Sequence, residues 1–374
     1  MPKVSVILTS FNHAKYLRES IDSVLTQTFT DFELFIWDDA SSDASWEIIR
    51  GYSDSRIKIF RNDIQKRGVW ITNKVISELS NGKYIAIQHS DDMWEPEKLA
   101  KQVESLDANP EVGAVFTHVQ MIDEEGNPLN LPWCCHFDQP NRSRHEWLRS
   151  FLEHINTLCH PSVLIRKSCY ETCGMYRYGL GQTGDFDMWI RLCLKYPIHI
   201  LEEKLTKLRI IDNEKNMSGN RRDSRIRTTF ELSLLLHNFK EIKTNAELFK
   251  IFPEIKPLYA DKQVHPHYIL AMLCVEKNFF PAGSYFGLNL LFELLQDSTI
   301  RKQLWNECNF DVNEFIRITG EIDPFNRETI EKLNLQLAER DAQLAERDAQ
   351  LAGILSSRPW RITAPLRKIL SFFR

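Results

Sequence analysis

The sequence has no long apolar run, no strong excess of charge of one sign and no signal-peptide pattern at its start. No apolar segment approaches the ~18–20 residues that cross a bilayer, and the first residues enter a strand pattern directly. With a net charge of −4 over 374 residues, the chain has no basic surface typical of nucleic-acid binding. We therefore expect a cytoplasmic protein without nucleic-acid partners.

The cysteines also lack a metal-binding pattern. There are eight of them, at scattered positions, and Cys134 and Cys135 are the one adjacent pair. Cys169 and Cys173 are close in sequence, but no second pair at zinc-site spacing accompanies them. Such cysteines suit a reducing compartment, which agrees with a cytoplasmic setting.

Short apolar strands alternate with amphipathic helices in the first half of the chain. We expect strands at residues 4–8, 32–37, 57–60, 84–87 and 112–119, and helices at 17–25, 45–52, 69–80 and 97–108. Strands separated by such helices imply right-handed crossovers and a parallel sheet. The sequence thus predicts an α/β, doubly wound, mostly parallel sheet with helices on both faces over residues 1–215, with 163–166 as an edge strand.

Three further segments follow the sheet domain, at residues 216–326, 327–352 and 353–374. Residues 216–326 have apolar residues at helical spacing, interrupted by prolines, and predict an all-helical domain. Residues 353–374 form a basic tail, and its part 358–374 is aromatic and lacks acids. That tail either lies on an anionic membrane surface as a peripheral contact or packs on its own domain.

Between them, residues 327–352 contain Leu-Ala-Glu-Arg-Asp-Ala-Gln twice in tandem. Leu337, Leu344 and Leu351 therefore recur every seven residues, as in a left-handed coiled coil. The alternate core positions would hold Arg340 and Arg347. Two interpretations stay open, a short coiled-coil-like helix that joins copies into a homo-oligomer and a plain solvated helix.

Two acidic pairs follow predicted strands. Asp38 and Asp39 come after the second strand, and Asp91 and Asp92 come after the fourth. In an open α/β sheet the carboxyl ends of the strands border the ligand crevice. Carboxylates there can hold Mg²⁺ or Mn²⁺ against a diphosphate, because both ions take oxygen ligands. Taken alone, such a pair fits a solvated turn or a helix N-cap better than a metal site, and Asp38 or Asp43 can cap the next helix.

Four motifs in this order resemble glycosyltransferase family 2, with the GT-A fold, and in particular its bacterial, non-processive members that make polysaccharide or lipopolysaccharide. The motifs span residues 4–12, 37–43, 90–92 and 184–189. The resemblance implies a metal-dependent, inverting transfer of a sugar from a nucleotide-sugar, by preference a UDP-sugar, to a hydroxyl of a glycan or lipid-linked acceptor. No Gln-x-x-Arg-Trp motif of a processive synthase is present.

The resemblance also implies roles for individual residues. Asp39 would contact the base, with Asp38 beside it, and Thr9 would be another nucleotide contact. Asp92 would ligate Mn²⁺ or Mg²⁺. Asp91 would face the ribose or the donor sugar and share in the metal site.

Asp185 would be the general base, because it occupies the second position of a motif that usually reads Glu-Asp and here reads Gly-Asp. Where many relatives have a further Asp, this chain has His89, so that either the site binds its metal more weakly or His89 touches a phosphate, and Mn²⁺ would tolerate the change better than Mg²⁺. Asp187 fits an N-terminal helix acid better than a catalytic role. Trp189 fits a core residue better than a sugar platform.

Two basic positions are candidates for the diphosphate. Arg209 resembles the arginine of a late motif whose other members are replaced here by Leu208 and Ile211. Arg67, with Lys66, lies on the loop after the third strand, where a phosphate contact and a solvated turn are equally compatible with the sequence.

Two other functions are alternatives to glycosyl transfer. Nucleotidyl transfer also uses paired acids, but it favours a Gly-rich basic loop after the first strand, which residues 9–13 do not supply. A catalytically degenerate protein that binds glycan or acts as a scaffold would explain the changes at His89, Gly184 and Ile211. The joint presence of the four acids at positions 39, 91, 92 and 185 opposes it.

Overall fold

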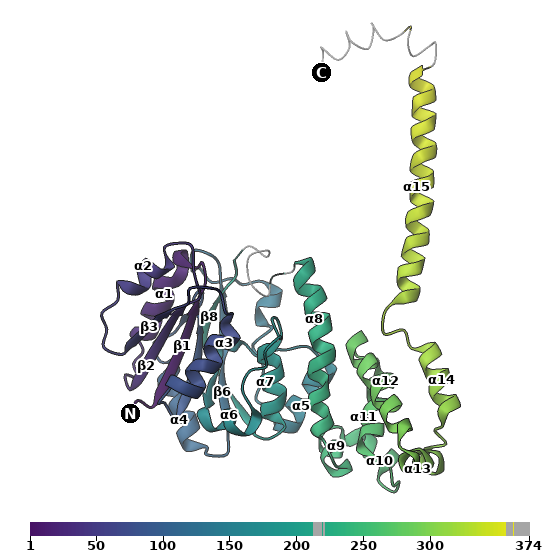
Figure 1. The fold of residues 1–374 in the computed structure, drawn as a ribbon, viewed down its shortest axis with the longest axis horizontal. Coiled ribbons are helices and arrows are strands. Elements are labelled where there is room, and N and C mark those ends of the chain that lie inside the picture. Colours follow the sequence, from purple (N-terminus) through teal and green to yellow (C-terminus); the bar gives the residue numbers. More distant parts are fainter. Residues whose placement is uncertain (212–218, 220, 357–361, 363–374) are drawn as a thin grey trace. The chain divides into compact units, whose positions relative to one another are not determined.

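The computed structural model describes residues 1–211, 219, 221–356 and 362. Within these residues an eight-stranded sheet has the order β3-β2-β1-β4-β7-β6-β8-β5 (Figure 1). The strands are β1 Val4–Ser10, β2 Phe32–Asp38, β3 Ile57–Arg61, β4 Tyr84–His89, β5 Met93–Trp94, β6 Ala114–Ile122, β7 Leu164–Arg166 and β8 Ile198–Arg209.

One half of this sheet is the parallel, doubly wound part that the sequence predicts. Strands β1 to β4 pair in parallel in the order β3-β2-β1-β4. The connecting helices are α1 Ala14–Leu25, α2 Ser45–Arg50 and α3 Gly68–Lys74, the last continued by a π-helical turn Val75–Leu79. Leu17, Ile21 and Val24 of α1 lie in the core. Their three- and four-residue spacing is the helical period on which the prediction rests.

Both faces of the parallel half are covered. Val6 and Leu34 belong to the core on the face of α1, α2 and α4 (Lys98–Ala108). Ile7, Phe35 and Ile85 point to the opposite face and are buried as well. Burial on both faces explains why these strands read as continuous apolar runs.

The other half of the sheet is mixed. Strand β7 pairs antiparallel with both β4 and β6, so it lies inside the sheet and not at its edge. The expected edge strand at 163–166 was therefore wrong. Three residues flanked by a 3₁₀ turn carry too little pattern to show that both sides are paired.

Strand β8 was not predicted from the sequence. It pairs in parallel with β6 and antiparallel with β5, and its register with β6 shifts between Thr117 and Val119. Glu202, Glu203 and Lys204, in its middle, are exposed or polar and interrupt the alternation that marks a strand. Its tertiary pairing, not its local pattern, makes it a strand.

The remaining helices belong either to the sheet region or to the helical region that follows β8. Those of the sheet region are α5 Arg144–Glu153, α6 Lys167–Cys173 and α7 Gly184–Cys193. Those of the helical region are α8 Arg222–Leu235, α9 Asn245–Ile251, α10 Lys256–Tyr259, α11 Pro266–Lys277, α12 Pro281–Gln296, α13 Ser298–Cys308 and α14 Val312–Glu321. Short 3₁₀ turns lie at Pro132–Cys135, His160–Ser162, Leu236–Glu241 and Pro253–Ile255.

The helical region is anchored to the sheet region by buried polar contacts. Glu231 of α8 accepts hydrogen bonds from residues just before α7, and Asn238 donates to Asp187. Figure 1 shows α8 beside α7. The chain divides into two compact units, Met1–Phe315 and Ile316–Arg374, so the predicted boundary at 215/216 falls inside the first unit. The four-part domain division stays a prediction.

Helix α15, Arg327–Ser356, contains the tandem repeat. Every residue of it is exposed, including Leu337, Leu344 and Leu351. The helix itself is as expected, while its assembly with a second copy stays a prediction. In the described part of the chain, no helix has the length and apolar character to cross a membrane. Apart from Ile362, the basic segment 358–374 lies outside the described residues.

We expect the seven-residue leucine stripe of α15 to join two copies of the chain. Replacing Leu337→Asp together with Leu344→Asp should convert the assembly to monomer, because a charge in the seam is left without water or a partner. Light scattering coupled to size exclusion measures the mass. The control is Ala342→Asp with Ala349→Asp on the opposite side of the helix, which should leave the mass unchanged. A wild-type chain that is monomeric at all concentrations would contradict the coiled coil.

Candidate active site

The acidic motifs meet at the carboxyl ends of the parallel strands. In the sheet register Thr9 of β1 lies between Trp37 of β2 and His89 of β4. The Asp39 N–H donates to the Ser10 carbonyl at 2.8 Å. The structure thus brings Thr9 and the two acidic pairs to one edge of the sheet, as the crevice argument predicts.

Asp39 shapes the loop that follows β3. Its carboxylate accepts from Asn62 Nδ2 at 2.7 Å, from the Lys66 N–H at 2.8 Å and from the Arg67 N–H at 2.8 Å. Asn62 Oδ1 in turn accepts from the Trp37 indole at 3.0 Å. Two backbone donors and one side-chain donor therefore hold the Asp39 side chain at a fixed place in the crevice.

Arg67 begins α3 in a strained backbone conformation. Its φ is +76°, a region that residues other than glycine seldom adopt. The hydrogen bond from its N–H to Asp39 accompanies this conformation, and its side chain is exposed at the crevice. A left-handed residue whose backbone is held by a buried acid is a typical feature of a functional loop.

Asp38 and Asp43 have structural contacts. Asp38 is fully buried, accepts from the Ser41 N–H and pairs with Arg61 at 3.3 Å. Asp43 accepts from the Ala14 N–H at the start of α1 and from the Ser45 N–H at the start of α2. Asp43 is therefore a helix-capping residue, as the alternative interpretation held.

The second acidic pair forms a cluster with a histidine. His89, Asp91 and Asp92 each offer a ligand atom within 4.8 Å of the others. Asp92 is 1% exposed and its Oδ1 accepts from the Arg209 N–H at 2.8 Å. No donor among the described residues satisfies its Oδ2. Burial, together with the nearby Asp91 carboxylate, raises the pKa of Asp92 to about 6.

His89 connects this cluster to His160 and, through it, to Tyr176. Its Nδ1 lies 3.4 Å from Asp92 Oδ2, and its Nε2 lies 3.2 Å from His160 Nδ1. His160 Nε2 lies 3.0 Å from the Tyr176 hydroxyl. Burial alone would lower the pKa of His89, but Asp92, Asp91 and Asp185 together raise it. Burial and the neighbouring His89 hold the pKa of His160 well below its usual value.

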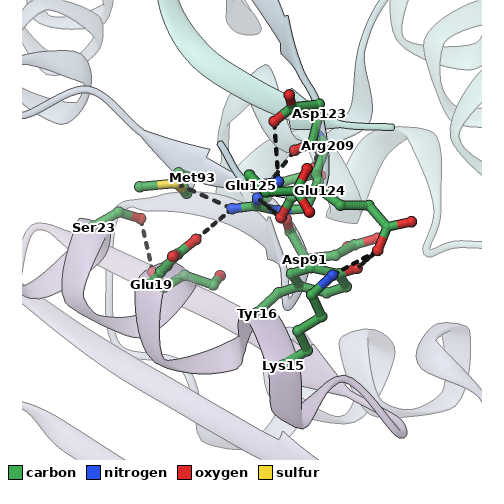
Figure 2. Close-up of polar contacts among 12 residues, drawn as sticks. Lys15, Tyr16, Glu19, Ser23, Asp91, Met93, Asp123, Glu124, Glu125 and Arg209 are labelled. Carbon is green, nitrogen blue, oxygen red and sulfur yellow. Dashed lines mark hydrogen bonds and ion pairs between the residues drawn. The ribbon is translucent and has the colours of Figure 1, made fainter. Parts of the chain in front are cut away.

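Arg209 holds the acidic loop in place. Its side chain is buried, and Figure 2 shows it among residues of three different segments. Its Nε donates to the Asp91 carbonyl at 2.9 Å, and its Nη1 donates to the Asp123 and Glu124 carbonyls at 3.1 and 2.8 Å. Its Nη2 donates to Glu19 Oε2 at 2.5 Å.

The same guanidinium lies over the Tyr16 ring, 4.9 Å from its centroid. Tyr16 and Lys15 both donate to Glu124 Oε2, so α1 and the loop after β6 are tied together next to Asp91 (Figure 2). Arg209 thus makes a set of structural contacts that its sequence motif does not reveal. Its diphosphate contact stays a prediction.

Asp185 lies in the first turn of α7. Its Oδ1 accepts from the Phe186 N–H at 2.7 Å and its Oδ2 accepts from Asn156 Nδ2 at 2.8 Å. Burial raises the pKa of Asp185 to about 6, although these donors and His89 act in the opposite direction. A carboxylate with a pKa near 6 is ionised at neutral pH and more basic than a solvated one, which suits a general base.

The helical region fixes the start of α7. The buried Glu231 carboxylate accepts from the N–H groups of Gly181, Gln182 and Thr183 at 2.7, 2.9 and 2.8 Å. A carboxylate at a helix N-terminus satisfies unpaired N–H groups and complements the helix dipole. A residue 46 positions after Asp185 in the sequence therefore orients the helix that carries it.

The other two candidates on α7 are structural. Asp187 is fully buried and paired with Arg177 and Arg191 at 2.9 and 2.8 Å. Trp189 is fully buried against Phe116 and His160. Neither side chain is exposed to a ligand, in agreement with the preferred interpretations of both.

Sequence reasoning missed the residues that support the acids. Asn156, Tyr176 and Glu231 lie in no motif that links them to the crevice. Glu231 carries no such signal either, because α8 has no marked apolar face and its neighbour Phe230 is exposed while Glu231 is buried. The others are polar residues of loops and short turns, where no periodicity marks burial.

Comparison with known proteins decides the family. The model of "Glycosyl transferase family 2" matches residues 5–174. The putative glycosyltransferase EpsE of Bacillus subtilis is 32% identical over 216 residues, which cover 56% of this chain and 73% of EpsE. An uncharacterized glycosyltransferase of Methanocaldococcus jannaschii is 29% identical over 277 residues, or 73% of this chain and 92% of that protein. The chain belongs to glycosyltransferase family 2.

Solved structures agree on the fold of this glycosyltransferase. The crystal structure of S. aureus TarS residues 1–349 has a TM-score of 0.53 and 14% identity, covering 84% of this chain and 90% of that one. The same fragment in complex with UDP-GlcNAc also has a TM-score of 0.53, with 16% identity and coverage of 84% and 81%. The predicted GT-A fold with a helical C-terminal region is thereby confirmed.

We expect removal of the Arg209 side chain to destabilise the glycosyltransferase. In Arg209→Met, the carbonyls of Asp91, Asp123 and Glu124 lose buried donors, so the free energy of unfolding should fall by on the order of 3–5 kcal/mol. Denaturant titration measures it. Lys15→Met, which breaks an exposed ion pair in the same cluster, should change stability little. Equal small effects of both variants would show that Arg209 is not the anchor of the acidic loop.

Proposed function

We propose that this glycosyltransferase is metal-dependent and inverting, and that it moves a sugar from a UDP-sugar to a hydroxyl of a glycan or lipid-linked acceptor in cell-surface polysaccharide synthesis. The observation that carries the proposal is the pairing of a buried, incompletely satisfied acid at Asp92 with a second raised-pKa acid at Asp185. Two such acids in one crevice suit two different tasks, cation binding and proton abstraction.

The nucleotide half of the donor would occupy the crevice beside Asp39. Among the described residues, its Oδ2 receives one hydrogen bond, from the Arg67 N–H. A carboxylate oxygen accepts two, so the second is available for the imide N–H of uracil. Thr9, at the end of β1, is next to Gly68 and can contact the nucleoside. The exposed Arg67 side chain would meet the diphosphate.

A divalent cation fits the cluster of His89, Asp91 and Asp92. The donor set contains two carboxylates, and Asp92 Oδ2 is a buried anionic oxygen that no described donor satisfies. Mn²⁺ or Mg²⁺ bound there would neutralise the charge that develops on the departing diphosphate. Arg209 keeps the Asp91 backbone and Asp92 Oδ1 in place, so in this proposal it acts as a positioning residue.

Asp185 would act on the acceptor. Its carboxylate takes the proton of the acceptor hydroxyl while that oxygen forms the new bond to the anomeric carbon of the sugar. The bond from this carbon to the diphosphate breaks, and its electron pair leaves with the nucleoside diphosphate. Asn156 and the Phe186 N–H hold the carboxylate in one orientation, and Glu231 holds the helix.

The raised pKa of Asp185 predicts the pH dependence of transfer. A base must be ionised, so kcat/KM should fall as the pH drops through about 6. Because the Asn156 amide stabilises the ionised form, Asn156→Leu should move this acid limb upward by about one pH unit. Asn289→Leu, in the helical region, should leave the profile unchanged. An acid limb that stays in place in Asn156→Leu would argue against Asp185 as the base.

We expect one UDP-sugar to bind in the presence of Mn²⁺ and not in EDTA. A panel of UDP-, GDP- and dTDP-sugars is measured by calorimetry and by donor hydrolysis, and TarS makes UDP-GlcNAc the first donor to try. Asp92→Asn should lower the Mn²⁺-dependent hydrolysis by about 100-fold or more. The control Asp107→Asn removes an acid paired with Lys3, at the opposite edge of the sheet.

Two results would overturn this proposal. If the folded chain binds no nucleotide-sugar, the donor assignment fails. If binding and hydrolysis are the same in EDTA and in Asp92→Asn, the metal dependence fails, whichever donor binds.

A further inference from the structure

A ring nitrogen of His89 faces a carboxylate oxygen of Asp92 inside the acidic cluster. His89 Nδ1 lies 3.4 Å from Asp92 Oδ2, which is too long for a normal N–H···O hydrogen bond. Asp92 Oδ2 is buried, and no donor from the described residues reaches it. A buried carboxylate oxygen of this kind is costly unless a cation satisfies it.

The other side of His89 is occupied by a relay of polar groups. His89 Nε2 lies 3.2 Å from His160 Nδ1, and His160 Nε2 lies 3.0 Å from the hydroxyl of the buried Tyr176. That hydroxyl reaches the Tyr170 hydroxyl at 3.5 Å. The neutral form of His160 carries one N–H, on either Nδ1 or Nε2.

With one N–H on His160, the hydrogen bonds along the relay can be donated in either of two directions. In the first, His160 donates to His89, which must then carry its own hydrogen on Nδ1. In the second, His160 donates to Tyr176 and accepts from His89 Nε2–H, and the Nδ1 lone pair of His89 points at Asp92. The Tyr176 oxygen is the acceptor that makes the second direction available.

We propose that His89 is a nitrogen ligand of the divalent cation, binding through Nδ1 beside Asp91 and Asp92, and that His160 and Tyr176 hold it in the required tautomer. A metal-bound histidine commonly donates its other N–H to a neighbouring acceptor, which fixes the ring and the tautomer. This inference rests on the proposed metal-dependent function and specifies its metal site.

A nitrogen ligand changes which cation the site prefers. Imidazole raises affinity for transition metals relative to Mg²⁺, which takes oxygen ligands and dehydrates reluctantly. The site of this chain should therefore select Mn²⁺ over Mg²⁺ more strongly than a site made of carboxylates alone. His89→Asp creates that comparison within the same protein.

The test uses the full chain with Mn²⁺ and UDP, without a sugar donor. Pulsed electron paramagnetic resonance of the bound Mn²⁺ should show modulation from a directly coordinated ¹⁴N nucleus. This modulation should be absent in His89→Gln and should persist in His199→Gln, which changes a histidine that contacts Ser105 on another part of the sheet. Competition by Mg²⁺ in the same titration should be stronger in His89→Asp than in wild type.

The relay is tested by removing its hydroxyl. Tyr176→Phe leaves His160 without its acceptor and favours the tautomer with a hydrogen on His89 Nδ1, so Mn²⁺ affinity should fall about 10–100-fold. Tyr170→Phe, one step further out, should have a much smaller effect. Equal affinity in Tyr176→Phe and wild type would overturn the role of the relay.

The outcomes separate this inference from the function on which it rests. Bound Mn²⁺ without ¹⁴N modulation in the wild-type chain would overturn His89 as a ligand and leave the metal-dependent function standing. Absence of any Mn²⁺ binding in the presence of UDP would overturn both. The decisive measurement is made on the wild type, so a variant that fails to fold does not affect it.

Discussion

The active-site edge of this glycosyltransferase depends on one buried cation, the Arg209 guanidinium. It lies at the end of β8 and bonds to backbone carbonyls of the acidic turn and of the loop after β6, while Glu19 of α1 balances its charge. Without it, two segments distant in sequence would leave unsatisfied carbonyls next to two carboxylates. The position of Asp91 and Asp92 therefore depends on the end of β8 as well as on β4, the strand that precedes them.

The burial of two carboxyl groups sets the acid–base properties of the site. Asp92 is buried and Asp185 is partly buried, and burial raises both pKa values to about 6. Their partners differ, however. Asp92 has one oxygen fixed by Arg209 and one without a described donor, whereas both oxygens of Asp185 accept hydrogen bonds. The first arrangement suits a cation and the second suits a proton, which is the reason for the roles that we propose for the two acids.

The helical region takes part in this arrangement and is more than an appendage. The Glu231 carboxylate binds the three N–H groups that precede α7, and Asn238 donates to Asp187 on the same helix. Asp187 is further paired with two arginines. The helix that carries Asp185 is therefore fixed at its first turn by side chains from a region that the sequence pattern separates from the sheet.

The sequence by itself determined the parallel half of the sheet and the identity of the acids. Apolar strands β1 to β4, the helical period of α1 and the acids directly after β2 and β4 are local signals, and local pattern is enough to place them. It did not reveal β8, the interior position of β7, or the supporting contacts of Asn156, His160, Tyr176, Arg209 and Glu231. These depend on pairing and burial between distant segments, for which a single sequence carries no period. Tertiary structure alone decided that Asp92 Oδ2 faces His89 and that Asp185 is partly buried beside Asn156.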